Sequence, residues 1–554
     1  MRGLASRIED QLKQRIREAV AAKFGIEMEP ELMAPSRKEF GDYSTNAAFV
    51  VAEKVGQPLR KVAEAIAPLI STSGGWLEGV EVAGPGFINF RLKPSWCLEG
   101  LKEIMELGRD FGKSDVGKGT RVQVEFVSAN PTGPMVVVQA RAGAVGDTLA
   151  NLLAWAGFDV SREFYVNDAG HQVEVLARSL EVRLRQLLGE QIELPEDCYP
   201  GDYLIDVASA YLKERGCGFL QKPEGERLAE LRDYAVESIR GSQEESLRRY
   251  GVEFDVWFSE RTLHQSGQVA AAVELLRQRG FVYSQDGALW FRSTAFGDDK
   301  DRVLVKSDGN YTYLAADIAY HLNKLRRGFA KIIDIWGPDH HGYIGRMKAA
   351  VEALGYPRDA LEVLIVQMVR LIRGGEVVKM SKRAGEFVTM DELLEEVGRD
   401  VARFFFLMRS CESHLDFDLD LGKLRSDENP VYYVQYAHAR ICSLMREAKE
   451  RGVEWPGGTE PDLSQLTDQS ELELAKKLVY FPQEIAGAAL TREPHRMPRY
   501  LMDLATAFHS FYTRCRILGV EPQLTAARLY LSDATRIVLR NGLEIIGVSA
   551  PEKM

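Results

Sequence analysis

The sequence predicts an α/β protein built around a doubly wound parallel sheet, with an α+β domain before it and an all-α domain after it. The central prediction comes from RVQVEFVSAN (121–130), a strand that leads through a loop into a helix containing GDTLANLLAWAG and then into a second strand, VSREFYVND. Such strand–helix–strand units are the building blocks of doubly wound sheets. Before about residue 110 the pattern indicates helices followed by short strands, and after about Asn429 it is helical almost to the end.

At 554 residues the chain is too long for a single hydrophobic core, and we expect four segments. The first segment ends with a strand, a turn and a strand in VEVAGPGFINFRL. The parallel-sheet domain contains a helical, charge-rich insertion, after which strand signals resume at GALWFRST, RVLVKSDG, KIIDIWG and LEVLIVQMV. The predicted bounds are 1–112, 113–370 with the insertion at about 181–263, 371–428, and 429–554.

The composition is that of a soluble globular protein, with 45% hydrophobic and 27% charged residues. The six cysteines are scattered and form no CxxC pair, which argues against a zinc ribbon and a disulfide framework and favours a reducing compartment. The first helix is charged and amphipathic, unlike a signal peptide, and no apolar run reaches the roughly 18 residues of a membrane span. We therefore expect a cytoplasmic protein with no membrane partner.

The charge distribution bears on a nucleic-acid partner. The chain has 70 Lys and Arg against 81 Asp and Glu, a net charge of −11. Residues 431–554 contain 15 basic and 15 acidic residues, so the other 430 residues carry the whole excess of acid. A neutral C-terminal region on an acidic body permits a local site for a polyanion, but from charge alone an ordinary solvated surface is the better explanation.

A first candidate site is the segment SANPTGPMVVVQARAGAVGD (128–147). It places a Pro- and Gly-rich loop and a helix N-terminus directly after a strand, which is a common phosphate-binding arrangement. The helix starts within MVVVQAR, yet it opens with three valines where phosphate binding favours glycine and polar donors. A P-loop is excluded, because the nearest matches, GRDFGKS and GKSDVGKG, precede the strand instead of following it.

A second candidate site is VVKMSKRAGEFVTMDELL (377–394), a loop followed by a helix that we expect to start near Thr389. Lys379, Lys382 and Arg383 place three cations within five residues, next to the hydroxyl of Ser381. This combination suits a di- or triphosphate whose negative charge grows in a transition state. The alternative is an exposed basic turn.

The motif KMSKR resembles the second signature loop of class I aminoacyl-tRNA synthetases, and residues 128–147 lie where that class carries its first signature, HIGH. The flanking SANPTGP, together with YVNDAGHQ, WGPDHHGYIGRMKAA, NPVYYVQYAHAR and NGLEIIGVSAPEKM, resembles arginyl-tRNA synthetases of the bacterial type. GDYSTNAAF resembles the tRNA-contacting N-terminal domain of that family, so the resemblance covers essentially the whole chain. It implies a class I catalytic domain, a helical anticodon-binding domain and an arginine–tRNA ligase activity.

The four HIGH positions of that family correspond to Val136, Val137, Val138 and Gln139, so the signature is degenerate. The family's two histidines donate hydrogen bonds to ATP phosphates, and here only Gln139 can still donate. A lost hydrogen bond to a charged group costs about 1.5–3 kcal/mol, while the backbone N–H groups and the helix dipole remain. We therefore expect an active enzyme. The alternatives are a catalytically silent synthetase-like protein that senses arginine or binds tRNA, and a related ligase for another amino acid.

The resemblance also assigns site residues. A planar guanidinium is best recognised by carboxylates, so Asp317 would pair with it, Tyr313 would pack against it, and Asn130 and Glu125 would address the α-amino end. The alternatives are that Glu125 caps local backbone and that Tyr313 is core. The implied arginine contacts are Glu125, Ser128, Asn130, Tyr313, Asp317 and His341. The implied ATP contacts are Pro134, Val136, Val137, Val138, Gln139, Asp339, His340, Met380 and Lys382, and the catalytic residues are Lys379, Ser381, Lys382, Arg383 and Gln139.

In VYYVQYAHAR, aromatic rings, an amide and an arginine suit unstacked RNA bases, although two of the three tyrosines are expected to be core. By resemblance the tRNA contacts are Gln435, Tyr436, Arg440 and Met554. His340 and His341 are adjacent and therefore poor co-ligands, so no metal site is predicted. The expected partners are tRNA(Arg), L-arginine and ATP with Mg²⁺ as substrate, with no zinc and no organic cofactor, acting on a monomer.

Overall fold

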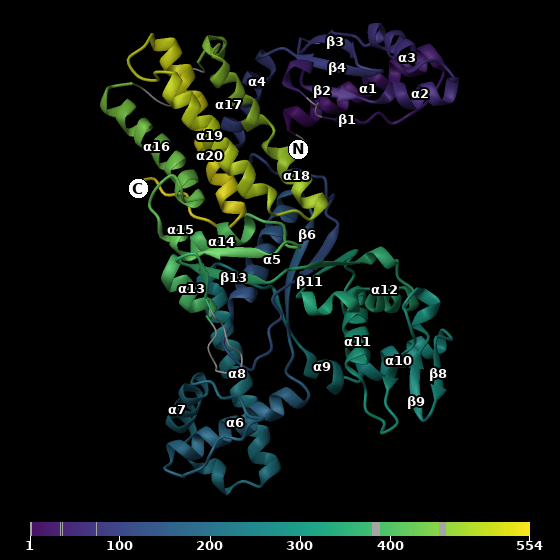
Figure 1. The fold of residues 1–554 in the computed structure, drawn as a ribbon, viewed down its shortest axis with the longest axis vertical. Coiled ribbons are helices and arrows are strands. Elements are labelled where there is room, and N and C mark those ends of the chain that lie inside the picture. Colours follow the sequence, from purple (N-terminus) through teal and green to yellow (C-terminus); the bar gives the residue numbers. More distant parts are fainter. Residues whose placement is uncertain (1–2, 34, 36, 74, 379–387, 454–460) are drawn as a thin grey trace.

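A five-stranded parallel sheet lies at the centre of the molecule (Figure 1). The computed structural model describes residues 3–33, 35, 37–73, 75–378, 388–453 and 461–554. The strand order is β12-β11-β5-β6-β7, so the chain winds to one side of β5 and later returns to its other side. This order confirms the doubly wound sheet, and in such folds the ligand crevice is expected where the strand order reverses, here at the carboxyl ends of β5 and β11. The strands are β5 (Arg121–Glu125), β6 (Asp159–Val166), β7 (Val256–Ser259), β11 (Lys331–Trp336) and β12 (Leu361–Ile365).

Helix α5 (Val137–Trp155) begins inside MVVVQAR, as predicted, with Val136 as its N-cap in an extended conformation. Ala, Leu and Val dominate the helix, and it is buried on most sides because it packs on β6 and against α14 (Arg399–Leu407). Gly146 is required at one contact, since a Cβ there would collide with the ring of Phe126. The helix therefore joins the sheet to the C-terminal half of the chain.

Between β7 and β12 the chain forms a group of helices and a small antiparallel sheet of order β10-β9-β8. GALWFRST and RVLVKSDG are strands as predicted, but they belong to this separate sheet. LEVLIVQMV splits into β12 and the start of β13, with a break between them. The elements are α9 (Glu260–Gln265), α10 (Gln268–Gln278), β8 (Val282–Gln285), β9 (Ala288–Phe291), β10 (Arg302–Val305), α11 (Tyr313–Arg326) and α12 (Ile344–Ala353).

The insertion is helical and has its own hydrophobic core, in which Leu180, Tyr211, Phe219 and Leu231 are fully or almost fully buried. Figure 1 shows it at the end of the molecule opposite the N-terminal domain. Near the end of the predicted range 181–263 the structure contains β7, and α9 begins within this range. The helices are α6 (His171–Leu187), α7 (Tyr203–Arg215) and α8 (Glu224–Tyr250).

The N-terminal domain is α+β, as predicted, with an antiparallel sheet of order β1-β2-β4-β3. Helix α4 (Ser95–Leu107) follows this sheet and packs on α17. The elements before α4 are α1 (Leu4–Phe24), β1 (Leu32–Met33), β2 (Tyr43–Thr45), α2 (Ala47–Val55), α3 (Leu59–Ile66), β3 (Leu77–Ala83) and β4 (Phe87–Leu92).

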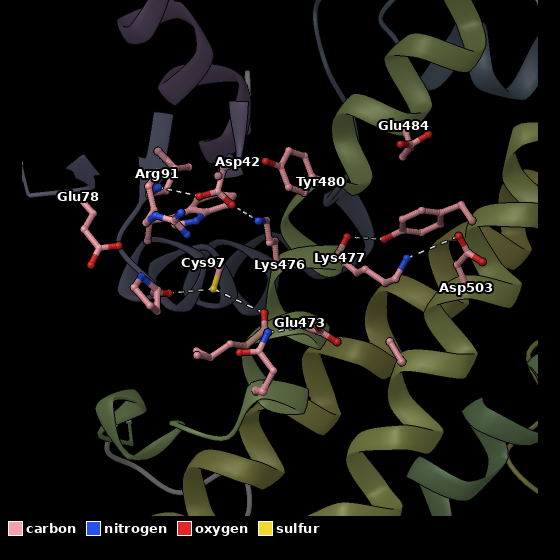
Figure 2. Close-up of a pocket in the computed structure, with 18 of the residues that line it drawn as sticks. Asp42, Glu78, Arg91, Cys97, Glu473, Lys476, Lys477, Tyr480, Glu484 and Asp503 are labelled. Atoms are coloured by element: carbon pink, nitrogen blue, oxygen red, sulfur yellow. Dashed lines mark hydrogen bonds and ion pairs between the residues drawn. The ribbon is translucent and has the colours of Figure 1, made fainter. Parts of the chain in front are cut away.

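A cavity of about 790 Å³ lies between the N-terminal domain and the C-terminal helices. Figure 2 shows Lys476 directed toward Asp42, with which it forms an ion pair across the interface. Tyr480 donates a hydrogen bond to the hydroxyl of Tyr43 at 3.0 Å beside this pair. These contacts fix the first domain against α17 (Gln469–Val479).

The C-terminal region is helical, and no strand follows Asn429 in the part of the chain that the structure describes. Figure 1 shows its long helices side by side, next to the N-terminal domain. Before them, β13 (Val369–Arg373) pairs with β14 (Glu376–Val377) and β15 (Leu415–Asp418). The helices are α13 (Met390–Val397), α15 (Leu419–Lys423), α16 (Pro430–Glu450), α18 (Phe481–Thr491), α19 (Arg496–Arg514) and α20 (Pro522–Ile545), in addition to α14 and α17.

Arg403, on α14, is a fully buried arginine that connects three parts of the chain. Its Nη2 donates to Asp147 on α5 at 2.5 Å, its Nε donates to the carbonyl of Ile546 at 2.8 Å, and its Nη1 donates to the carbonyl of Gly251 at 3.3 Å. Helix α5, the residue after the insertion and the end of the last helix therefore meet at one guanidinium.

All six cysteines are free in the structure. Five of them are buried, and Cys217 is exposed. Over the described residues, no helix has both the length and the apolar character needed to cross a bilayer.

Candidate active site

The loop after β5 is held in a strained conformation at the edge of the crevice. Val127 and Ser128 both have positive φ angles, +69° and +42°, which non-glycine residues rarely adopt. The Ser128 hydroxyl donates to Oε1 of Glu125 at 2.9 Å and accepts from the backbone N–H of Tyr165 at 3.1 Å. Such strain persists when surrounding contacts enforce it, and it is common at functional sites.

In the first turn of α5, one backbone N–H already has a hydrogen-bond acceptor, and two others have no acceptor within the helix. Oε1 of Gln139 accepts from the backbone N–H of Val136 at 2.7 Å, so the side chain caps its own helix and that N–H is not open to a ligand. The N–H groups of Val137 and Val138 belong to the first turn, where helices have no intrahelical acceptors. The amide NH₂ of Gln139 is the remaining side-chain donor at this helix end.

The insertion fixes the loop that precedes α5. Nε2 of Gln243, on α8, donates to the carbonyls of Asn130 at 3.0 Å and Gly133 at 2.8 Å, and the hydroxyl of Tyr203 donates to the carbonyl of Thr132. Pro134 lies exposed in the same loop. The candidate phosphate-binding turn is therefore held from both sides, by the sheet and by the insertion.

The five residues of KMSKR, Lys379, Met380, Ser381, Lys382 and Arg383, lie outside the described residues. The chain that follows them is anchored at the first candidate site. Thr389 forms an antiparallel bridge with Val136, and the N–H of Met390 donates to the carbonyl of Met135 at 2.8 Å. Thr389 and Glu392 form a reciprocal capping box, which confirms a helix start at this position.

Asp317, on α11, is a carboxylate satisfied by a neutral donor. The hydroxyl of Tyr343 donates to its Oδ2 at 2.5 Å. Burial raises the pKa of Asp317, and the hydrogen bond from Tyr343 opposes this rise. Tyr313, one helical turn before Asp317, is 72% exposed, so the alternative that it is core is wrong.

Glu260, the first residue of α9, is a second acid of the crevice and was missed in the sequence. It is buried, and it forms hydrogen bonds with Tyr165 and with Nε2 of His264, the latter at 3.4 Å. Burial raises the pKa of Glu260, and the hydrogen bond from His264 lowers it. The negative charge of Asp317 is a smaller effect that raises this pKa. Among the described residues neither Glu260 nor Asp317 has an ion pair with a lysine or an arginine. Glu260 could have been found as an acid that directly follows a strand of the sheet. That strand, β7, was not predicted from the sequence.

A buried polar network lies under the crevice. Lys324 forms ion pairs with Glu125 and, at 2.8 Å, with Asp334 on β11. His321 completes the network, with Nε2 at 2.9 Å from Asp334 and Nδ1 at 2.8 Å from the carbonyl of Asp317. Burial would raise the pKa of Asp334, but Lys324 and His321 lower it to about 2. Glu125 is therefore an ion-paired acid and does not cap local backbone.

The remaining predicted ligands of arginine and ATP are exposed. Asn130 donates through Nδ2 to Gln172 at 2.8 Å, on the insertion side of the crevice. Asp339, His340 and His341 lie in the 3₁₀ turn Pro338–Tyr343 that follows β11. The charge of His340 is among those that lower the pKa of Asp317, after the hydrogen bond from Tyr343 and the charge of His321. Within the described ranges, no group of three or more His, Cys, Asp or Glu residues is arranged to hold a metal ion.

Tyr432, Tyr436 and His509 form an aromatic cluster on α16 and α19, and the tyrosines of α16 are less buried than expected. The ring of Tyr436 lies 6.1 Å from that of Tyr432 and 6.0 Å from that of His509, both stacked. Cζ of Arg440 lies 4.8 Å from the centre of the Tyr436 ring, and its Nη2 donates to the Tyr436 hydroxyl at 3.1 Å. Tyr432, Tyr433 and Tyr436 are all half-buried, so the expectation of two core tyrosines is wrong.

The C-terminal tail runs along α16. Nε2 of Gln435 donates to Asp400 on α14 and to the carbonyl of Ser549, both at 2.9 Å, so this amide has a structural use. Nδ1 of His438 lies 2.9 Å from the carbonyl of Pro551. Met554, at the end of this tail, is 51% exposed. The tail is thus fixed beside the aromatic cluster.

The doubly wound sheet, its crevice beside a helix N-terminus and the following helical domain define a class I aminoacyl-tRNA synthetase. Residues 101–405 match the family described as tRNA synthetases class I (R), catalytic domain. Residues 6–92 match the arginyl tRNA synthetase N terminal domain, and residues 434–554 match the DALR anticodon binding domain. The chain belongs to the arginyl-tRNA synthetase family.

Full-length relatives agree with this assignment. The arginine–tRNA ligase of Symbiobacterium thermophilum is 55% identical over 558 residues, which cover 99% of this chain and 100% of the relative. That of Geobacillus thermodenitrificans is 51% identical and covers 100% of both chains. The Thermus thermophilus arginyl-tRNA synthetase structure shares the fold, with a TM-score of 0.75 at 24% identity over 98% of this chain and 100% of that one.

Proposed function

We propose that the chain is an active arginine–tRNA ligase that works through the crevice between β5 and β11. A carboxylate oxygen of L-arginine attacks the α-phosphorus of ATP, which forms arginyl-adenylate and releases pyrophosphate. A ribose hydroxyl of the 3′-terminal adenosine of tRNA(Arg) then attacks the adenylate carbonyl, and AMP leaves. No side chain needs to form a covalent bond, so catalysis consists of alignment and charge stabilisation. ATP enters with Mg²⁺ as part of the substrate.

The observation that carries this proposal is the acid pair Asp317 and Glu260. Among the described residues, both carboxylates are satisfied by neutral or weakly basic donors: Tyr343 for Asp317, and Tyr165, His264 and the amide of Asn167 for Glu260. Two buried acids that interact with each other, and that form no ion pair with a lysine or an arginine in the described part of the chain, favour a ligand that supplies a positive charge. A guanidinium supplies a delocalised positive charge and five donors in a fork that matches carboxylates. The proposed arginine side chain therefore completes this part of the crevice.

The other end of the substrate is assigned to the strained loop and the turn after β11. Asn130 and Ser128 lie in the loop that follows Glu125, and their polar atoms face the α-amino and carboxylate end of arginine in this proposal. His341 contributes from the turn after β11. Tyr313 covers the guanidinium with its exposed ring, which supports packing against a planar cation.

The ATP site is proposed at the start of α5. The N–H groups of Val137 and Val138 and the amide of Gln139 face the phosphates, while Val136 and Pro134 line the approach of the nucleoside. Asp339 and His340 contribute from the turn after β11. We assign stabilisation of the leaving pyrophosphate to the cationic loop, with Lys379, Ser381, Lys382 and Arg383 as its catalytic residues and Met380 beside ATP.

Replacing Gln139 with alanine is expected to raise KM for ATP about tenfold, because a hydrogen bond to a charged phosphate is lost. KM for arginine is expected to stay unchanged. ATP–pyrophosphate exchange at varied ATP and at varied arginine measures both constants.

The matched control is Gln139→Glu, whose carboxylate can still accept from the N–H of Val136 and so keeps the helix cap. If Gln139 acts only as a cap, Gln139→Glu should use ATP as well as the wild type. The donor role predicts a raised KM for ATP in both variants, and a normal value in both contradicts it.

The alternative function is a catalytically silent protein that senses arginine or binds tRNA, and it is favoured by one observation, the replacement of HIGH by three valines and a glutamine. ATP–pyrophosphate exchange with arginine, with and without tRNA, separates the two functions. An active ligase gives arginine-dependent exchange when tRNA is present. Exchange under neither condition supports the silent protein, and exchange driven by another amino acid supports a ligase of different specificity.

We propose that tRNA(Arg) is contacted by the aromatic cluster on α16 and α19 and by the end of the C-terminal tail. Tyr436 and Arg440 present a half-buried ring and a guanidinium, which suit stacking with unpaired bases. Met554 lies at the exposed end of the tail. Gln435 contributes by holding that tail in place.

Tyr436→Ala is expected to raise KM for tRNA about tenfold in an aminoacylation assay, because stacking of a base on an aromatic ring contributes about 1–3 kcal/mol. Tyr433→Phe is the control on the same helix, since it removes only the hydroxyl that donates to Thr506 at 3.2 Å. An unchanged KM for tRNA in Tyr436→Ala would remove this ring from the tRNA site.

Three further expectations stay predictions. The chain acts as a monomer in the cytoplasm, where its tRNA partner is used. It needs neither zinc nor an organic cofactor. Its functional divisions are 1–112, 113–370, 371–428 and 429–554.

A further inference from the structure

Lys324, on α11, is a lysine with no exposed surface that joins two strands under the crevice. Its ammonium forms an ion pair with Glu125 on β5 and a second one, at 2.8 Å, with Asp334 on β11. These are the two strands between which a doubly wound sheet binds its ligands. We infer that Lys324 is a positioning residue for arginine activation, which acts on the substrate through Glu125. This inference rests on the proposed function.

A chain of contacts leads from Lys324 to the loop after β5. Its ammonium fixes Oε2 of Glu125, and Oε1 of the same carboxylate accepts from the Ser128 hydroxyl at 2.9 Å. That hydroxyl also accepts from the N–H of Tyr165 at 3.1 Å. Val127 and Ser128 have positive φ angles, and such conformations persist only where neighbouring contacts enforce them. Lys324 thereby helps to hold the strained loop that carries the proposed arginine contacts.

The four acids around the crevice differ in their ion pairs. Glu125 and Asp334 share the cation of Lys324. Asp317 and Glu260 have only neutral or weakly basic donors within the described part of the chain. Lys324 therefore forms its ion pairs with Glu125 and Asp334 and not with the two acids assigned to the guanidinium, and this keeps Glu125 from competing for that group.

Lys324 also favours the charged form of Glu125. Burial raises the pKa of Glu125, and the ammonium of Lys324 opposes that rise. Burial would lower the pKa of Lys324, but the two carboxylates raise it to about 12, so the ammonium stays charged. Without this cation Glu125 would bind a proton at higher pH. The titratable groups that face Glu125 are Lys324 and Tyr320 on α11, Asp334 on β11, and Glu163 and Tyr165 on β6.

A purely structural role is the competing explanation. Buried ion pairs are weak evidence for stability, because replacing them with apolar groups is often neutral. If Lys324 had only a structural role, its replacement would lower the thermal midpoint and would change kcat and both Michaelis constants together. A positioning residue changes KM for arginine and the pH dependence of arginine use, and leaves KM for ATP unchanged.

The test compares wild type and Lys324→Met by ATP–pyrophosphate exchange in the presence of tRNA, across a range of pH. KM for arginine is expected to rise about tenfold and KM for ATP to change by less than about twofold. The acid limb of kcat/KM for arginine is expected to move to higher pH, because Glu125 loses the cation that favours its charged form.

Arg327→Met is the matched control, since Arg327 is the C-cap of the same helix and binds the buried Glu163 at 2.6 Å. It should leave KM for arginine unchanged. A cycle with Glu125→Gln adds a second test. If Lys324 acts through Glu125, the double variant has the same KM for arginine as Glu125→Gln alone.

Equal changes in both Michaelis constants, an unmoved acid limb or additive effects in the cycle would each overturn the inference. If Lys324→Met does not fold, Lys324→Gln provides the same tests, because its amide can donate to either acid without a charge. A wild type that shows no exchange with arginine refutes the proposed function instead, so the two failures are distinguishable.

Discussion

Replacing Asp317 with asparagine is expected to lower kcat/KM for arginine by about a hundredfold or more. Removing one partner of a desolvated, hydrogen-bonded charge pair costs about 2–5 kcal/mol, and each 1.4 kcal/mol is tenfold in rate. The amide oxygen of asparagine can still accept from Tyr343, so the local contact at 2.5 Å is retained while the charge is removed. Exchange at varied arginine and at varied ATP measures the loss, and KM for ATP is expected to be unaffected.

Tyr343→Phe is the control for this experiment. It removes the donor to Asp317 but keeps the carboxylate, and its effect is expected to stay within about tenfold. If Asp317→Asn uses arginine nearly as well as the wild type, the guanidinium is held elsewhere and the assignment of the acid pair is wrong.

Arg403→Met is expected to lower the thermal midpoint of the catalytic domain by roughly 10 °C. Breaking a buried ion pair by removing one partner costs about 3–5 kcal/mol, because the other charge stays buried. At roughly 2–4 °C per kcal/mol for a domain of this size, the loss is large. The variant leaves Asp147 without its contact at 2.5 Å and also removes donors from the carbonyls of Ile546 and Gly251. Circular dichroism during heating measures the midpoint.

Arg399→Met on the same helix is the comparison, since its guanidinium lies near the surface and only 3.4 Å from Asp400. Exposed ion pairs contribute about 0–1 kcal/mol, so a shift of one or two degrees is expected. A similarly small shift in Arg403→Met would mean that α5, the insertion and α20 are not held together by this guanidinium.

The regular part of the fold could be predicted from the sequence because its signals are local. The strand of residues 121–125, the helix that starts in MVVVQAR and the capped helix after Thr389 each depend on neighbouring residues. β7 was missed because four half-buried residues between charged helices are too few to show a periodicity.

The candidate site could be predicted only in part, for a different reason. Asp317 and Tyr313 lie on one face of a single helix, so their proximity follows from helical spacing. The ion pair of Lys324 with Glu125 joins residues that are 199 positions apart, and it depends on the order of strands in the sheet. Glu260 depends on the same order, because it is positioned by β7 at the edge of the sheet. No local pattern contains this information.

The central claim is that the guanidinium of arginine lies between Asp317 and Glu260 while Lys324 keeps its pair with Glu125. A crystal structure of the protein soaked with arginine and a non-hydrolysable ATP analogue tests it most directly. We expect the guanidinium of arginine within hydrogen-bond distance of both Asp317 and Glu260, and the phosphates of the ATP analogue at the start of α5. An empty crevice, or Asp317 and Glu260 bound only to their present tyrosine and histidine donors, would contradict it.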